Sequence, residues 1–178
     1  MANDCITEYK FVGTDGSLRG MHTMLKSLQG GAAMSPVPMG AIIEGLILSP
    51  LQLGPESLYM RGEVDTFDKP YKLEGRSEHC MDVVEVAAWR PCSLAMKLFA
   101  ETFGAVCNWY SYEPGNAIYE KHDPSSVFEH VECVVAVTGD DTAYEKVFPG
   151  RKEAEEYAFN LGERDPKLDI EVIDVDEI

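Results

Sequence analysis

The side chains best suited to chemistry gather in one stretch of this 178-residue chain, NWYSYEPGNAIYE at residues 108–120. It combines one tryptophan and three tyrosines with a glutamate on either side of a Pro-Gly-Asn turn. Aromatic rings can pack against a planar ligand, and carboxylates can bind it or exchange its protons. The stretch and its surroundings are therefore a candidate ligand groove. Its candidate binding residues are Trp89, Trp109, Tyr110, Tyr112, Glu113 and His122.

Glu113 and Glu120 flank the turn and His122 follows, so these residues are also the candidates for acid–base catalysis. The chain has 31 acidic residues, however, which makes neighbouring carboxylates common by chance. No local pattern indicates the burial that shifts the pKa of a catalytic carboxyl. We therefore interpret these carboxylates as solvated charges and predict no catalytic residue.

The motifs of the common catalytic mechanisms are absent from the sequence. It lacks the GxGxxG and Walker loops, the GxSxG elbow and the HExxH pair. Its five cysteines are scattered without a CxxC pair, which favours reduced thiols over disulfides or a zinc framework. His79 and Cys80 are adjacent and cannot both point at one ion from an ordinary strand. We expect no metal and no cofactor.

The charge of the chain limits its partners. Fifteen Lys and Arg against 31 Asp and Glu give a formal charge of -16 at pH 7. Such a surface repels phosphate, so direct nucleic-acid binding is not expected, and a protein partner or self-association is favoured instead. The first residues lack a signal-peptide pattern, and the longest apolar run, at residues 41–48, is too short to cross a membrane. These patterns predict a soluble, cytoplasmic protein.

Periodic patterns predict the elements that position the aromatic stretch. Strands with period-two alternation are predicted at residues 5–12, 58–66, 81–89, 105–112 and 117–122, the third of them central. One helix follows a cap at Asp15 or Ser17 and ends before Gly30. A second helix follows Pro91 and ends at Gly104.

The order strand, helix, strand, strand, helix, strand is that of a ferredoxin-like sandwich. This is an α+β fold in which two helices cover one face of an antiparallel sheet. Two strands, a helix and a last strand follow, which predicts a C-terminal strand-strand-helix-strand extension. We therefore expect a ferredoxin-like domain at residues 1–123 and the extension at residues 124–178. An apolar, Gly- and Pro-rich insertion at residues 30–57 is interpreted as a lid over the core or a contact surface for a partner.

The faces of two strands decide whether the aromatic rings are accessible. Along the strand at residues 105–112, Tyr110 and Tyr112 share one face and Trp109 lies on the other. If the valines of the central strand face the helices, Glu85 and Trp89 lie on the opposite, open surface. Aromatic rings on that surface either bind a ligand or lie under the extension or the insertion, and the second interpretation is preferred.

The run VVEVAAWRPCSLAMKLFAETFGAVCNWYSYEPGNAIYE and the start MANDC resemble the ferredoxin-like domain of the YubB-type proteins of plasmids and phages. The matching positions are Trp89, Pro91, Phe103, Trp109, Tyr110, Glu113 and Gly115. The resemblance covers residues 80–121 and, more loosely, residues 1–30. It implies the fold and a mobile-element origin, and it assigns no substrate or catalytic residue.

The sequence therefore predicts an acidic, non-enzymatic protein-interaction module, an accessory protein of a mobile element. In a narrower form of this hypothesis, clustered carboxylates imitate DNA phosphates to occupy a basic host protein. The alternative is a small-molecule binder or small hydrolase-like enzyme that uses the aromatic and carboxylate groove of the hairpin.

Overall fold

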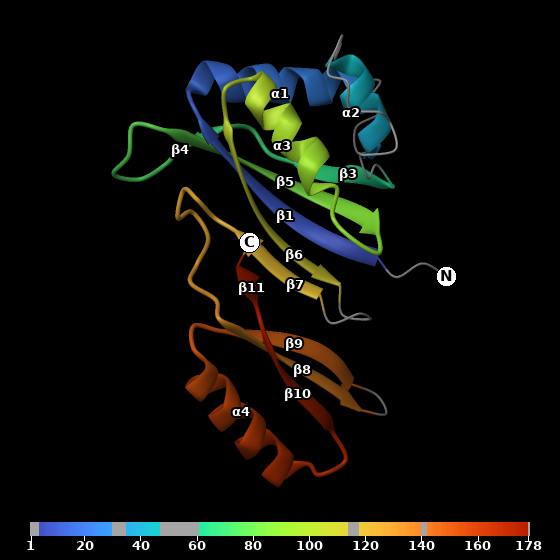
Figure 1. The fold of residues 1–178 in the computed structure, drawn as a ribbon, viewed down its shortest axis with the longest axis vertical. Helices are drawn as coiled ribbons and strands as arrows, with labels where there is room; N and C mark the ends of the chain where they lie inside the picture. Colours follow the sequence, from blue (N-terminus) through green and yellow to red (C-terminus); the bar gives the residue numbers. More distant parts are fainter. Residues whose placement is uncertain (1–3, 30–34, 47–60, 114–117, 140–141, 178) are drawn as a thin grey trace. The chain divides into compact units, whose positions relative to one another are not determined.

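The computed structural model describes residues 4–29, 35–46, 61–113, 118–139 and 142–177 (Figure 1). These residues form an α+β protein with four helices and mostly antiparallel sheets. They divide into two compact units. The first is Met1–Ile118 with His122–Val127, and the second is Tyr119–Lys121 with Phe128–Ile178.

The first unit is built on an antiparallel sheet. Its strands are β1 (Asp4–Gly13), β2 (Val37–Pro38), β3 (Gly62–Phe67), β4 (Tyr71–Lys72), β5 (His79–Ala88), β6 (Val106–Glu113) and β7 (Ile118–His122). The middle residues of β7, Tyr119–Lys121, are grouped with the second unit. The strand order is β7-β6-β1-β5-β3-β2, and β4 pairs with β5. The strand predicted at residues 81–89 is confirmed as β5, which pairs with β1 along its whole length and lies inside the sheet.

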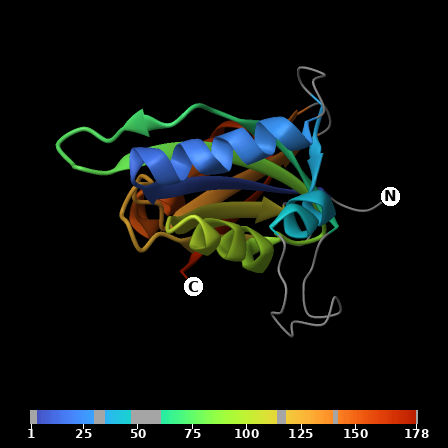
Figure 2. The same ribbon diagram turned by 90° about the horizontal axis from the view of Figure 1, so that it is seen from above.

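Three helices of the first unit lie on the same face of this sheet (Figures 1 and 2). They are α1 (Asp15–Leu28), α2 (Met39–Gly45) and α3 (Ser93–Thr102). The apolar stripe predicted for the first helix is buried at Leu18, Met21 and Leu25. Its cap is Thr14, not Asp15 or Ser17, because the extended backbone of Thr14 lets its Oγ1 accept a hydrogen bond from the Ser17 amide at 3.1 Å.

Part of the predicted insertion packs into the core of the first unit. Val37, Met39 and Ile42 are fully buried there. For residues 35–46 this supports the interpretation of the insertion as a cover over the core. Residues 30–34 and 47–57 of the insertion, residues 58–60 of the predicted second strand and the turn at residues 114–117 lie outside the described residues.

The arrangement of β5 considered from the sequence has its valines toward the helices and Glu85 on the opposite surface. In the structure, the face that carries Glu85 is the one toward the helices. Met81, Val83 and Ala87 are buried in the core under the helices, whereas the alternate valines of β5 are half-buried on the other face. Glu85 shares the core side and is fully buried instead of lying on an open surface. Alternation could not distinguish the two arrangements, because both faces of this strand are largely apolar.

The second unit contains β8 (Cys133–Gly139), β9 (Thr142–Phe148), α4 (Arg151–Arg164) and β10 (Asp169–Asp174). The strands form an antiparallel sheet in the order β10-β8-β9. A short strand, β11 (Asp176–Glu177), pairs in parallel with Glu120 and Lys121. Side chains of β8, β9 and α4 form a separate small core. None of the helices in the described ranges of either unit is long and apolar enough to cross a membrane.

Candidate functional site

The six residues predicted to form a groove are not gathered on one face of the sheet. Trp109 and Glu113 lie on the core side of β6 and are buried. Tyr110 and Tyr112 alternate with them and therefore project from the opposite side, where both are half-buried with ring centroids 6.3 Å apart. The two tyrosines and the tryptophan thus cannot contact one ligand from the same side of the strand.

The remaining two candidates lie at the ends of strands. Trp89 follows β5 with a left-handed backbone (φ 69°) and is 46% exposed, and the guanidinium of Arg61 stacks 4.5 Å from its ring centroid. His122 ends β7, and its ring lies 4.2 Å from the ring of Trp109. This stacking explains Trp109 as a packing residue, while ligand binding by any of the six stays a prediction.

The chemically richest location in the first unit is a buried polar network between the sheet and the helices. We call it the Glu85 network, and its members are Cys5, Thr7, Tyr9, Glu85, Cys92 and Ser111, none more than 1% exposed. Strand register explains how it forms, because Thr7 of β1 lies opposite Glu85 on one side and Ser111 on the other. Thr7 Oγ1 and Ser111 Oγ are 2.7 Å apart, and Cys5 Sγ lies 3.3 Å from Ser111 Oγ.

Glu85 connects the two central strands to α3. Tyr9 Oη donates a hydrogen bond to Glu85 Oε2 at 2.7 Å, and the Cys92 backbone amide lies within 3.2 and 3.3 Å of the two carboxylate oxygens. Cys92 is the residue before α3, and its own side chain provides no cap. The carboxylate therefore caps this helix from the neighbouring strand, at the end where the helix dipole favours a negative charge.

Gly62 of β3 closes the network from the side. A Cβ atom at this position would lie 2.8 Å from Glu85 Oε1, 2.8 Å from the Cβ of Ala87 and 3.1 Å from Cys92 Sγ. Only a residue without a side chain lets β3 approach this closely. The backbone of β3 thus helps to seal the carboxylate from water.

Burial disfavours the charged forms of the titratable groups in the network. It raises the pKa of Glu85, and the hydrogen bonds from Cys92 and Tyr9 offset this effect only in part. Burial, followed by the charge of Glu85, raises the pKa of Tyr9 well above its ordinary value, and burial is also the main cause of the raised pKa values of the Cys5 and Cys92 thiols. At neutral pH these thiols are poor nucleophiles, because the thiolate is the reactive form.

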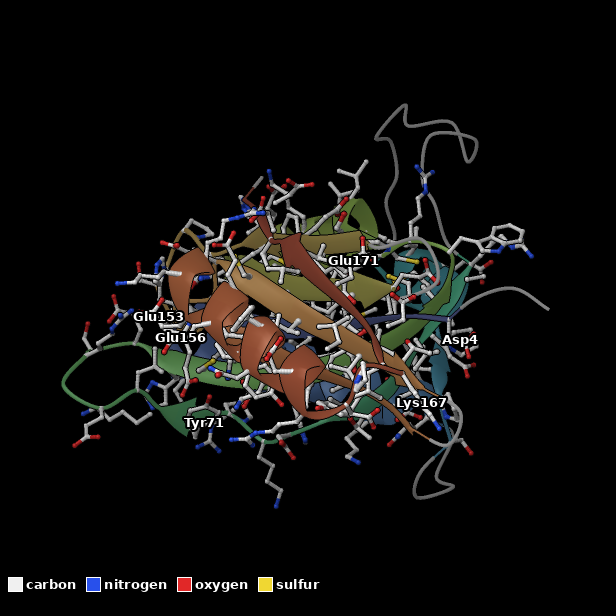
Figure 3. All side chains as sticks on the ribbon, turned by 90° about the horizontal axis from the view of Figure 1, so that it is seen from below. Asp4, Tyr71, Glu153, Glu156, Lys167 and Glu171 are labelled. Carbon is white, nitrogen blue, oxygen red and sulfur yellow. The ribbon has the colours of Figure 1, made fainter. Side chains whose placement is uncertain are left out.

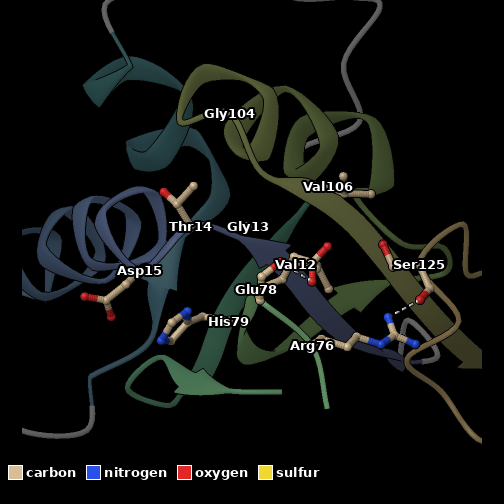
Figure 4. A pocket seen from close by; sticks show the side chains of 11 residues that line it. Val12, Gly13, Thr14, Asp15, Arg76, Glu78, His79, Gly104, Val106 and Ser125 are labelled. Atoms are coloured by element: carbon tan, nitrogen blue, oxygen red, sulfur yellow. Dashed lines mark hydrogen bonds between the residues drawn. The ribbon is translucent and has the colours of Figure 1, made fainter. Parts of the chain in front are cut away.

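A pocket of about 650 Å³ lies elsewhere in the first unit, at the start of α1 (Figure 4). The polar groups around it are largely engaged with neighbours. Arg76 donates to the backbone oxygens of Ser125 and Ser126 at 2.7 and 3.1 Å, and Asp15 accepts from Arg19 at 2.7 Å. His79 also lines the pocket, and its Nδ1 atom is buried without a hydrogen-bond partner among the described residues. We therefore assign no ligand to this pocket.

Among the residues described, no group of three or more His, Cys, Asp or Glu side chains is arranged to hold a metal ion. The Glu85 network in particular combines its one carboxylate with hydroxyl groups and protonated thiols. Hydrogen bonding is thus the chemistry that its contacts show.

The outer face of α4 carries an exposed aromatic residue among acids. Phe159 is 68% exposed, and Glu155, Glu156 and Glu163 lie three or four residues from it along the helix and are exposed as well. We call these four residues the Phe159 face. Glu156 is labelled on the surface of this helix in Figure 3. Glu155 also accepts a hydrogen bond from Arg151 at 2.8 Å.

The residues of α4 that face the core explain why Phe159 is exposed to solvent. Ala154 is fully buried, and Tyr157, Ala158 and Leu161 pack against the small core of the second unit. Phe159 is displaced from this stripe by the helical repeat of 3.6 residues. The same periodicity could have identified it from the sequence, as an apolar residue outside the predicted core stripe.

Sequence reasoning also missed the burial of Glu85. The available signal was an acidic residue in the middle of an otherwise apolar strand, MDVVEVAA. Such a residue is either solvent-facing or held by buried partners. One donor, Tyr9, is 76 residues away in the sequence, and the other is the Cys92 amide beyond the end of the strand, so the pattern of the strand itself could not identify them.

Comparison with known proteins yields no relative. No protein-family model, no curated protein and no solved structure matches the chain.

Proposed function

We propose that this protein is an acidic, non-enzymatic interaction module that binds a basic protein partner through the Phe159 face of α4. The observation that carries the proposal is a phenylalanine that is 68% exposed between three exposed glutamates, in a chain with a formal charge of -16. Aromatic residues at the centre of an interface often supply much of its binding energy. Surrounding charges determine which partners approach and how fast they associate.

The partner that fits this face has an apolar pocket for the phenylalanine ring and Lys or Arg around the pocket rim. Acidic neighbours at positions i−4, i−3 and i+4 from Phe159 would lie opposite such a rim. Because the charges are on the surface, the interaction is expected to weaken as the salt concentration rises.

The state of the Glu85 network supports a non-enzymatic role. Its thiols and its phenol are protonated at neutral pH, and its members are closed off from solvent. The contacts of Glu85 hold strands and a helix together, as a structural group does. A role in stabilising the fold thus explains the Glu85 network without catalysis.

We further propose that the first unit is a ferredoxin-like sandwich and that the chain belongs with the YubB-type proteins of mobile elements. The strand order β6-β1-β5-β3, with α1 and α3 on one face, supports the first proposal. The second rests on the sequence resemblance over residues 80–121. The division of the chain into a domain at residues 1–123 and an extension at residues 124–178 stays a prediction.

A displayed library of random peptides, selected on the full chain, tests the proposed function. The enriched peptides should combine Lys or Arg with apolar residues and should lose at least about tenfold in affinity for Phe159→Ala. Val147→Ala is the matched control, because Val147 is 49% exposed on β9 of the same unit. Failure to enrich any peptide, or equal binding to wild type and Phe159→Ala, would refute the proposal.

A further inference from the structure

A second pocket of the first unit, with a volume of about 510 Å³, collects basic side chains in this acidic protein. We call it the lysine pocket. Its lining residues are His22, Lys26, Phe67, Asp68, Lys69 and Tyr71. They come from α1 and from a segment that runs from the end of β3 to the start of β4, and these two parts are far apart in the sequence.

Contacts with one aromatic ring organise the lysine pocket. His22 and Lys26 are one helical turn apart on α1 and both approach Phe67. The Lys26 ammonium lies 4.7 Å from the centroid of that ring, and the His22 ring meets it edge-on at 5.5 Å. Lys26 Nζ also donates to Gln29 Oε1 at 3.0 Å. These contacts hold one ammonium and one imidazole beside the pocket.

Basic groups outnumber acidic groups on the lining of the lysine pocket. In the chain as a whole, acids outnumber Lys and Arg by 31 to 15, yet neither Lys26 nor Lys69 forms an ion pair among the described residues. Asp68 is the acid on the lining, and the Tyr71 hydroxyl is directed to Asp82, with both carboxylate oxygens at 3.1 Å. The pocket therefore combines two ammonium groups and an imidazole with a single carboxylate.

The titration of His22 agrees with this geometry. Burial lowers the pKa of His22, and the charges of Lys26 and Lys69 lower it further. Both ammonium groups are thus close enough to the imidazole to disfavour its protonation. An anion between these groups would reverse that effect.

We propose that the lysine pocket binds a phosphate group, as free phosphate or as a small phosphomonoester. The two lysines match the charge of a phosphate dianion, and lysine is a common phosphate ligand. The volume exceeds that of a phosphate ion and leaves room for a small organic group beside Phe67 and Tyr71. At physiological ionic strength, screening over roughly 8 Å reduces the repulsion from more distant acids. This site is independent of the Phe159 face.

An NMR titration of the full chain with inorganic phosphate and with phenyl phosphate, at constant ionic strength, tests the proposal. The His22 ring resonances should shift with both ligands, and the pKa of His22 should rise because the bound anion favours the imidazolium. Lys26→Gln and Lys69→Gln should each weaken binding by about tenfold, and Asp68→Asn should strengthen it. Tighter binding of phenyl phosphate would identify a phosphomonoester, and equal binding would identify free phosphate.

The matched control is Lys72→Gln, which removes an exposed lysine that does not line the pocket. This variant should bind both ligands as the wild type does. The proposal would be overturned if the His22 resonances did not shift with phosphate. It would also be overturned if Lys72→Gln lost as much affinity for the ligands as the pocket variants do. Unchanged backbone spectra of the variants without ligand would show that they are folded.

Discussion

Tyr9 and Glu85 form a hydrogen bond of 2.7 Å although both side chains are fully buried. They belong to the adjacent strands β1 and β5, and the same carboxylate accepts from the Cys92 amide at the start of α3. One acidic residue therefore links two central strands to a helix. Removing a single partner leaves buried polar groups unsatisfied, which costs more than removing an exposed contact.

Tyr9→Phe should lower the free energy of unfolding by about 1–3 kcal/mol, because the Glu85 carboxyl loses a buried donor. Tyr71→Phe is the matched control, since Tyr71 also donates to a carboxylate, that of Asp82, but is 41% exposed. Its cost should stay below about 1 kcal/mol. Denaturant unfolding of both variants measures the difference. Equal costs would contradict the assigned role of the buried bond.

The stability contributed by Glu85 should depend on pH. Because the pKa of this carboxyl is raised from 4.5, the folded protein binds its proton more tightly than the unfolded chain does. The resulting stabilisation is fully present below pH 4.5 and is lost as the pH rises through the folded-state pKa. Unfolding free energies of wild type and Glu85→Gln should be measured from pH 4 to pH 8. The stability of the wild type relative to Glu85→Gln should decrease as the pH rises. A constant difference across the range would exclude a raised pKa.

Gly62→Ala should destabilise the first unit by about 1–3 kcal/mol, because the added methyl group meets both the Glu85 carboxylate and the side chain of Ala87. Gly40→Ala serves as the control. A Cβ atom at Gly40 of α2 has no neighbour within 4 Å, so this change should be neutral or slightly stabilising. Thermal unfolding of the two variants provides the comparison. A neutral Gly62→Ala would show that β3 can move away from Glu85.

The cysteines should react slowly in the native protein. All five are free and buried, and burial raises the pKa values of Cys5 and Cys92. A thiol reagent should therefore modify five residues quickly in denaturant but none quickly in native buffer. Mass spectrometry after a short exposure identifies any modified site. Rapid native modification of Cys5 or Cys92 would show that the Glu85 network opens to solvent.

Local patterns in the sequence determined the elements. The alternation around residues 81–89 and the apolar stripe of Leu18, Met21 and Leu25 predicted β5 and α1, because each follows from the geometry of a single segment. The same alternation correctly separated Trp109 from Tyr110. The periodicity of a short run of residues encodes whether it forms a strand or a helix and which of its residues share a face.

Tertiary packing decided which face became the core and which polar groups met. Period-two alternation is symmetric, so it could not show that the face of β5 bearing Glu85 would turn toward the helices. That choice became favourable because Tyr9 of another strand and the Cys92 amide at the start of α3 both donate to the carboxylate. The lysine pocket likewise exists only where α1 approaches the end of β3. The sequence by itself determined the segments, and long-range hydrogen bonding and burial determined the sites.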